Sequence, residues 1–241
     1  MIKNNIELLS IHIPKTGGSS FQKSLQALYG EDAVLRLDFT VRDTAEGPRM
    51  VATNRTSQEL LDQIYSEEQL SPTIRVLHGH FHYQNFVRFF DLPENARVVT
   101  WLRHPIARIV SNYHYLVASF HREVQHTPLS SKLFKRLVKS LPEFAAQPRD
   151  VNLYSDYLRG RRLSEFDFVG IIEAYDSELD RLGSILGMGE VTHFKVNRAA
   201  KPAPALLPQQ EIALQAHNSE NLDIYNEALA LSTGRKPASQ G

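Results

Sequence analysis

The stretch SIHIPKTGGSSF, residues 10–21, joins an apolar run to an amphipathic one. The run that leads into it, Ile6–Ile13, has the length and composition of a short buried strand. The segment that follows places Phe21 and Leu25 at helical spacing, and Gly30 suits the end of that helix. The sequence therefore predicts a strand, a turn that contains glycine, and a helix.

The turn between this strand and helix has the composition of an anion-binding loop. Successive backbone N–H groups and a helix N-terminus converge at such turns, and many folds hold phosphate there. The loop of nucleoside triphosphate-binding proteins reads G-x-x-x-x-G-K-[ST], whereas here Lys15 precedes Gly17 and Gly18. The alternative is an ordinary turn softened by glycine, with Lys15 exposed to solvent. The candidate hydroxyl donors of the loop are Thr16, Ser19 and Ser20.

Strands and helices alternate along the rest of the chain. Residues 40–54 are expected to be irregular, and Ser57 is expected to cap a helix over residues 58–65. The alternation predicts an α/β protein, with a P-loop-like three-layer fold in which helices flank a central, mostly parallel sheet. We expect a single domain over residues 1–231 and a frayed tail over residues 232–241. Further strands are expected within residues 33–39, 73–81, 96–103, 166–171 and 191–197.

The composition is that of an ordinary globular protein. Of the 241 residues, 42% are hydrophobic and 22% are charged, and no apolar run is long enough to span a membrane. The absence of cysteine excludes disulfides, thiolate catalysis and zinc sites made of cysteine. The formal net charge of +0 gives no overall field for polyanions, so we expect no nucleic-acid partner. The N-terminus lacks the pattern of a signal peptide, and we expect a cytoplasmic protein.

A second candidate anion site lies in the stretch RHPIARIVSNY, residues 103–113. Arg103 ends a predicted strand, and Pro105 suits the first position of a helix that carries Arg108 and Ser111. Ligands of α/β proteins bind at the carboxyl ends of strands, and a guanidinium can hold two phosphate oxygens at once. The alternative is that Arg103 pairs with a carboxylate and Ser111 faces solvent. Together with the first loop, this stretch favours a ligand with two separated anionic groups.

Three histidines alternate in the stretch HGHFHY, residues 78–83, at the end of a predicted strand. On a straight strand His78, His80 and His82 share one face, so a metal site has to be considered. The sequence offers no companion carboxylate or H-x-x-x-H helix to complete a ligand set, and we predict no metal. We expect Gly79 to bend the chain so that one histidine points into the cleft as a base. A purely structural role for the histidines is the alternative.

Taken together and in this order, the three clusters resemble the sulfotransferase superfamily. The resemblance is greatest to its carbohydrate branch, the heparan- and chondroitin-uronosyl 2-O-sulfotransferases and their bacterial relatives. It rests on the segments HIPKTGGSSF, LHGHFHYQNF and VVTWLRHPIARIVSNYHYL, with weaker support from FVGIIEAYDSELDRL and NLDIYNEAL. It implies transfer of a sulfuryl group from 3′-phosphoadenosine 5′-phosphosulfate (PAPS) to an acceptor hydroxyl, that of a saccharide in this branch, without a metal.

The resemblance also implies a role for each cluster. The first loop, with Lys15, Thr16 and the backbone of residues 17–20, would hold the 5′-phosphosulfate. Arg103 and Ser111 would hold the 3′-phosphate. Lys15 would also neutralise the charge that develops on the leaving group.

The remaining implied roles fall on the histidines and on a later loop. His80 matches the family's histidine base, which would take the proton of the acceptor hydroxyl. His78 and His82 are expected to lie against the acceptor. The proline-bearing loop VNRAAKPAP is expected to close over the nucleotide with contacts from Asn197 and Lys201.

Two other functions and one surface feature remain open at this point. A nucleotide-dependent kinase with an unusual phosphate loop would need magnesium ligands and a lysine after the glycines. A non-catalytic nucleotide- or glycan-binding module of the same fold would lack turnover, and the presence of Lys15 and His80 argues against it. The basic stretch SSKLFKRLVKSLPEF can be the solvated face of a helix, or it can bind an anionic saccharide or a membrane surface.

Overall fold

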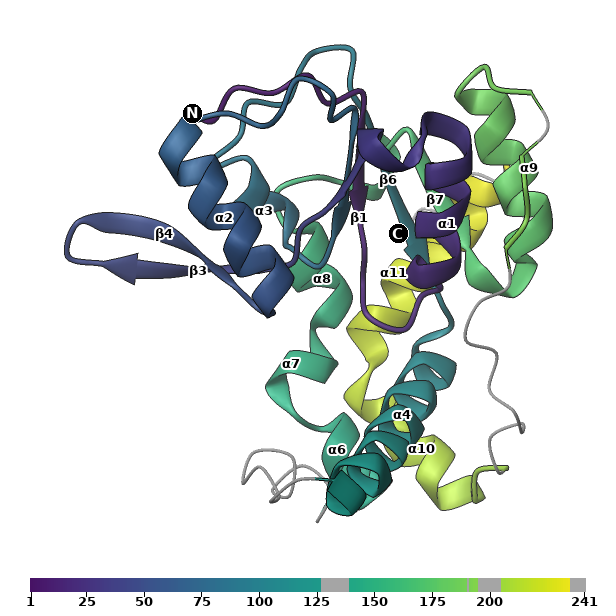
Figure 1. Cartoon of the computed structure of the whole chain (residues 1–241). Coiled ribbons are helices and arrows are strands. Elements are labelled where there is room, and N and C mark those ends of the chain that lie inside the picture. Colours follow the sequence, from purple (N-terminus) through teal and green to yellow (C-terminus); the bar gives the residue numbers. More distant parts are fainter. Residues whose placement is uncertain (127–138, 190, 195–204, 235–241) are drawn as a thin grey trace.

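Five parallel strands form the centre of the molecule, in the order β2-β5-β1-β6-β7 (Figure 1). The structure is a computed structural model, and it describes residues 1–126, 139–189, 191–194 and 205–234. The sheet confirms the predicted α/β class with a mostly parallel central sheet. Its strands are β1 (Leu8–Ile11), β2 (Val34–Arg36), β5 (Val76–Gly79), β6 (Arg97–Leu102) and β7 (Phe168–Ile171).

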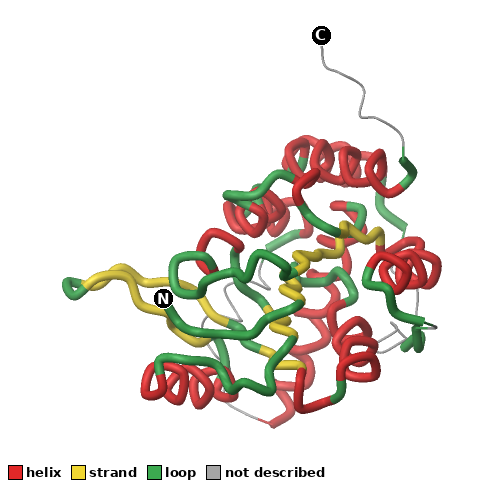
Figure 2. Tube along the Cα trace, turned by 90° about the horizontal axis from the view of Figure 1, so that it is seen from above, coloured by secondary structure: helices red, strands yellow, loops and turns green. Residues whose placement is uncertain are grey.

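Successive strand residues face two separate hydrophobic layers. Leu8 and Val99 pack in one layer, and their neighbours Leu9 and Val98 pack in the other. This is the pattern of a parallel sheet that is covered on both faces, as Figures 1 and 2 show. The first layer includes α1 (Gly18–Tyr29) and α9 (Tyr175–Ile185). The second includes α2 (Arg55–Glu67), α3 (Tyr83–Phe86), α8 (Leu153–Leu158) and α11 (Ser219–Ser232).

A third hydrophobic cluster lies between helices that stand beyond the carboxyl ends of the strands. These helices occupy the lower part of Figure 1. The cluster packs Ile109, Phe144 and Leu214, all completely buried, between three helices. This cluster places a wall of helices opposite the strand ends. The three helices are α4 (Pro105–His126), α6 (Leu141–Ala145) and α10 (Pro208–His217), and α7 (Pro148–Val151) connects α6 to α8.

The expectation of irregular structure over residues 40–54 was wrong. Strands β3 (Phe39–Thr44) and β4 (Gly47–Ala52) pair as an antiparallel hairpin that projects from the body (Figures 1 and 2). Only Phe39 and Met50 of the hairpin are buried, and both join the main core. Because the other positions are partly or fully exposed, their polar side chains concealed the period-two pattern.

Two further expectations need correction. Helix α2 begins at Arg55, because Asn54 is the cap that accepts a hydrogen bond from the Ser57 N–H at 2.8 Å. The Ser57 hydroxyl instead accepts from the Asp38 N–H. The part of the predicted final strand that is described, 191–194, is not a strand, and Val191 packs against α9 in the first layer.

At the C-terminus, α11 ends at Ser232, where the tail was expected to begin, and residues 235–241 lie outside the described part. The basic positions Lys132, Lys135 and Arg136 also lie outside it. Among the described residues, no helix combines the length and apolar character needed to cross a bilayer. A single domain over residues 1–231 stays a prediction.

Candidate active site

A cavity of about 780 Å³ lies at the carboxyl ends of β1, β6 and β7. Its walls come from the β1–α1 loop, from α4 and from the turn after β7. It therefore occupies the place where open α/β sheets bind their ligands. The predicted site residues that line it are Lys15, Gly17, Gly18, Ser19, Ser20, His80, Arg103 and Ser111.

The β1–α1 loop follows a path that requires its glycines. Gly17 has a φ of 82°, in the left-handed region, and a Cβ there would lie 2.3 Å from the Ile172 side chain. A Cβ on Gly18 would lie 2.0 Å from the ring of His12. Helix α1 starts at Gly18 with no side-chain cap and no acidic residue in its first turn. Its N-terminus is therefore available to an anion in the cavity.

Lys15 and Arg103 bring two positive charges into the cavity from different elements. Arg103 follows β6, and its Nη1 donates to the main-chain oxygen of Lys15 at 3.4 Å. Burial lowers the pKa of the Lys15 ammonium from its ordinary value, and the charge of Arg103 lowers it further. Within the described part of the chain, neither side chain forms an ion pair. The positive charges of Lys15 and Arg103 therefore remain available to an anionic ligand.

The backbone around Arg103 is held by side chains from other elements. The Tyr154 hydroxyl donates to the Arg103 main-chain oxygen. The carboxylate of Glu173 accepts from the His104 N–H at 2.8 Å and from the Tyr225 hydroxyl at 3.1 Å. Glu173 lines the cavity and already accepts at the N-terminus of α4, while the Arg103 guanidinium and the Ser111 hydroxyl also line this side of the cavity.

Arg108 lies outside the cavity, although it shares α4 with Ser111. Its guanidinium is 1% exposed and pairs with the carboxylate of Asp150 at 3.2 Å. Arg149 lies 3.4 Å from the same carboxylate. Arg108 therefore joins α4 to α7 inside the protein, and it is not a ligand-binding residue.

His80 is the histidine of the HGHFHY stretch that reaches the cavity. Strand β5 ends at Gly79, and the His80 N–H donates to the Asp38 carboxylate at 2.8 Å. The Nδ1 of its ring lies 2.7 Å from the main-chain oxygen of His12. Since a carbonyl only accepts, Nδ1 carries the proton and Nε2 keeps a lone pair. Burial lowers the pKa of His80 from its ordinary value, while the Asp38 carboxylate acts in the opposite direction.

The other two histidines of the stretch do not line the cavity. His78 is 1% exposed, its Nδ1 lies 2.8 Å from the Ser10 hydroxyl, and burial lowers its pKa to about 3. His82 precedes α3 and packs on the ring of Tyr157, with 4.7 Å between the ring centroids. The chain bends after Gly79, so the shared face of a straight strand does not form.

Thr16 also lies outside the cavity wall, because its buried hydroxyl donates to the Ile13 main-chain oxygen at 2.8 Å. Its contribution is to the shape of the loop. The predicted nucleotide contacts Asn197 and Lys201 lie outside the described residues.

Sequence reasoning missed several residues of the cavity wall. Arg36 lines it and pairs with Asp38 at 3.2 Å, beside His80. His12 and Tyr115 also line it, and Glu173 closes one side. His12 stands inside the decisive loop sequence, and its place directly after a parallel strand was the signal that could have identified it.

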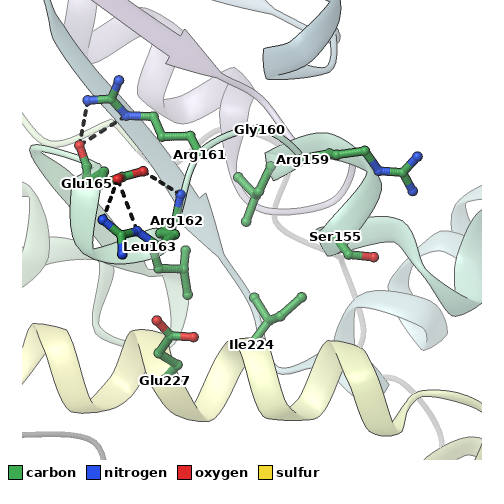
Figure 3. A pocket seen from close by; sticks show the side chains of 10 residues that line it. Ser155, Arg159, Gly160, Arg161, Arg162, Leu163, Glu165, Ile224 and Glu227 are labelled. Carbon is green, nitrogen blue, oxygen red and sulfur yellow. Dashed lines mark hydrogen bonds and ion pairs between the residues drawn. The ribbon is translucent and has the colours of Figure 1, made fainter.

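A second cavity, of about 460 Å³, lies between the segment that follows α8 and helix α11 (Figure 3). Three arginines line it, but each has a partner. Arg159 pairs with Asp156 at 2.7 Å, Arg162 pairs with Glu165 at 2.7 Å, and Arg161 donates to the Glu165 main-chain oxygen. It is therefore a weaker anion site than the first cavity.

Residues 1–220 match the sulfotransferase family. The chain belongs to this family, and its general chemistry is the transfer of a sulfuryl group. No curated protein matches the sequence.

Two solved structures similar to this chain are sulfotransferases. The one from Alicyclobacillus acidocaldarius is 13% identical, with a TM-score of 0.45, over 97% of this chain and 98% of its own. Mouse sulfotransferase SULT7A1, complexed with PAP, is 11% identical, with a TM-score of 0.47, over 95% of this chain and 88% of its own.

Proposed function

We propose that the protein transfers a sulfuryl group from PAPS to a carbohydrate hydroxyl, with His80 as the general base. One observation carries the proposal. Within the described residues, the same cavity contains an imidazole whose Nε2 keeps its lone pair and two cations without a carboxylate partner, Lys15 and Arg103. A base beside an anion site is the arrangement that transfer to a hydroxyl requires.

The donor carries two separate anionic groups, and two sets of cavity residues are proposed to hold them. The loop backbone over residues 17–20 and the N-terminus of α1 suit the 5′-phosphosulfate, and Ser19 and Ser20 add hydroxyl groups. Arg103 and Ser111, on the other wall, suit the 3′-phosphate. When bound, PAPS supplies an activated sulfuryl group on a phosphate leaving group. Asn197 and Lys201 are predicted to contact the nucleotide as well.

The residues of the cavity then have three tasks. His80 accepts the proton of the attacking hydroxyl at Nε2, and its lowered pKa keeps it neutral near pH 7. Lys15 places its positive charge where the bridging oxygen becomes negative. The two anion sites orient the donor so that attack proceeds in line, and positioning supplies most of the rate in such transfers.

A carbohydrate acceptor is supported by the resemblance of the HGHFHY segment to the uronosyl 2-O-sulfotransferases. The acceptor would enter beside His80, where Arg36 lines the cavity and pairs with the buried Asp38. His78 is buried and His82 packs on Tyr157, so their predicted contacts with the acceptor stay predictions.

The proposal is tested by incubating the protein with sulfur-labelled PAPS and a panel of saccharide, phenolic and lipid acceptors. We expect label on a saccharide, and adenosine 3′,5′-bisphosphate bound more tightly than ATP without added metal. Transfer only to phenols or lipids would contradict the carbohydrate acceptor. Phosphoryl transfer from ATP would favour the kinase, and nucleotide binding with no transfer to any acceptor would favour the binding module.

A further inference from the structure

The imidazole of His12 fills the space between the donor loop and His80. On one side, a Cβ added to Gly18 would lie 2.0 Å from both Cε1 and Nε2 of this ring, so the ring edge lies directly against the loop. On the other side, the ring stacks on His80, with 4.1 Å between centroids and 26° between planes. The flat ring of His12 therefore lies between the donor loop and His80.

His12 is the middle ring of a stack that runs from the core to the cavity. It also stacks on His78, at 5.0 Å between centroids and 15° between planes. His78 is itself fixed through the Ser10 hydroxyl. His12 is 8% exposed, and its Nδ1 is buried without a hydrogen-bond partner in the described structure. An unpaired buried nitrogen lowers stability, so the fold alone gives no reason for an imidazole here.

The main chain of His12 makes the second connection to His80. Its carbonyl accepts from His80 Nδ1 at 2.7 Å, which fixes the tautomer that leaves Nε2 unprotonated. One residue therefore determines both the tautomer of the base and the surface on which its ring lies.

We propose that His12 is a positioning residue for His80. Its carbonyl fixes the tautomer of His80. Its ring holds His80 at a set distance from the donor loop and shields the His80 ring from water. The inference rests on the proposed role of His80 as the base. His12 itself does not transfer the proton.

The charges around the three histidines agree with His80 as the group that takes the proton and His12 as a neutral neighbour. Burial lowers the pKa of His12 well below its ordinary value, and a proton on His80 or His78 lowers it further, so His12 stays neutral while His80 titrates. The charged groups that act on His80 are Asp38, which raises its pKa, and Arg36, which lowers it. Both remain when the ring of His12 is removed, so a change in the pKa of His80 then reports its hydration.

The tautomer is tested on the wild-type protein by nitrogen NMR with labelled histidine. His80→Gln identifies the His80 signals among those of the ten histidines. We expect the proton on Nδ1 and a midpoint below the ordinary value of about 6.5. If neutral His80 carries its proton on Nε2, the inference is overturned.

The role of the ring is tested with His12→Ala and His12→Phe. In His12→Ala we expect the pKa of His80 to rise toward its ordinary value and kcat to fall at least tenfold, on the scale of a misplaced catalytic group. The affinity for adenosine 3′,5′-bisphosphate should change less than about threefold, because Lys15 and Arg103 remain. His12→Phe keeps a flat ring and should retain the low pKa of His80 and most of kcat.

Each outcome separates this inference from the proposed function. An unchanged His80 pKa and kcat in His12→Ala would overturn the positioning role. If His12→Phe lowered kcat as much as His80→Ala does, His12 would be a proton-transfer group. If the larger phenyl ring prevents folding, His12→Ala and the wild-type spectrum decide. If the wild-type protein transfers no sulfuryl group, the proposed function fails, and the NMR measurements still decide whether His12 controls His80.

Discussion

The ammonium nitrogen of Lys15 lies 4.1 Å from the centroid of the Tyr115 ring, so a side chain of the donor loop reaches across the cavity to α4. Lys15 has a φ of 72°, in the left-handed region that residues other than glycine rarely adopt. Such backbone strain is typical of functional positions. A contact of this kind contributes about 0.5–1 kcal/mol at an exposed site, so a bound anion can compete with the ring for Lys15.

Lys15→Ala should lower kcat more than it lowers donor affinity, because the charge acts most strongly on the leaving group. We expect a loss of about 10²–10³-fold in kcat, the scale for removing one group that stabilises developing charge. Turnover and the affinity for adenosine 3′,5′-bisphosphate would be measured side by side. Lys23→Ala, on the exposed side of α1, is the matched control. Equal losses in both quantities would make Lys15 a ground-state anchor.

Arg103→Ala should weaken binding of adenosine 3′,5′-bisphosphate by about 1.5–3 kcal/mol, the scale of a hydrogen bond to a charged group. The reason is that Arg103 faces the cavity and has no carboxylate partner in the described structure. Calorimetry measures the change. Arg97→Ala is the control, since Arg97 begins the same strand at the opposite edge and pairs with Asp167. Unchanged affinity in Arg103→Ala would remove Arg103 from the donor site.

The parts of the fold that sequence reasoning predicted are those set by local pattern. Strands β1 and β6 are mostly apolar because both of their faces are largely buried, and such runs are visible without the structure. The loop with Lys15 was evident from its glycines. The contact of Asp38 with His80 and the stack of His12 on His80 join residues 42 and 68 positions apart, and no local period reports them.

The ion pair between Arg108 and Asp150 predicts a large effect on stability. Both side chains are almost fully buried, at 1% and 3% exposure. Arg108→Ala would leave the Asp150 carboxylate buried, with the partly exposed Arg149 as its one remaining ion-pair partner among the described residues. The free energy of unfolding should therefore fall by about 3–5 kcal/mol. Urea unfolding measures this. Arg55→Ala, in an exposed pair with Glu59, should leave stability nearly unchanged. If Arg108→Ala lowered the free energy of unfolding no more than Arg55→Ala, the buried ion pair would not be important for stability.

His80→Ala should lower kcat by about 10²–10⁴-fold, the usual size of general-base catalysis, with donor affinity nearly intact. In the wild-type protein kcat should rise with pH as His80 loses its proton, and then level off. Because burial lowers the pKa of His80, the midpoint should lie below about 6.5. His82→Ala is the matched control, since that ring packs on Tyr157. If His82→Ala lost turnover and His80→Ala kept it, His82 rather than His80 would be the base.

The close approach of Gly79 to residues 37 and 38, between β2 and β3, is predicted to control the position of His80. A Cβ on Gly79 would lie 1.9 Å from the Leu37 main-chain oxygen and 3.0 Å from the Asp38 carboxylate. Gly79→Ala must therefore displace the segment whose carboxylate holds the His80 N–H, and overpacking of this kind costs about 1–3 kcal/mol of stability. We expect kcat to fall with little change in bisphosphate affinity, because Lys15 and Arg103 lie on other elements. Gly189→Ala, where no described residue beyond the chain neighbours lies within 4 Å of the added carbon, is the control. Wild-type turnover in Gly79→Ala would show that the position of Asp38 does not govern His80.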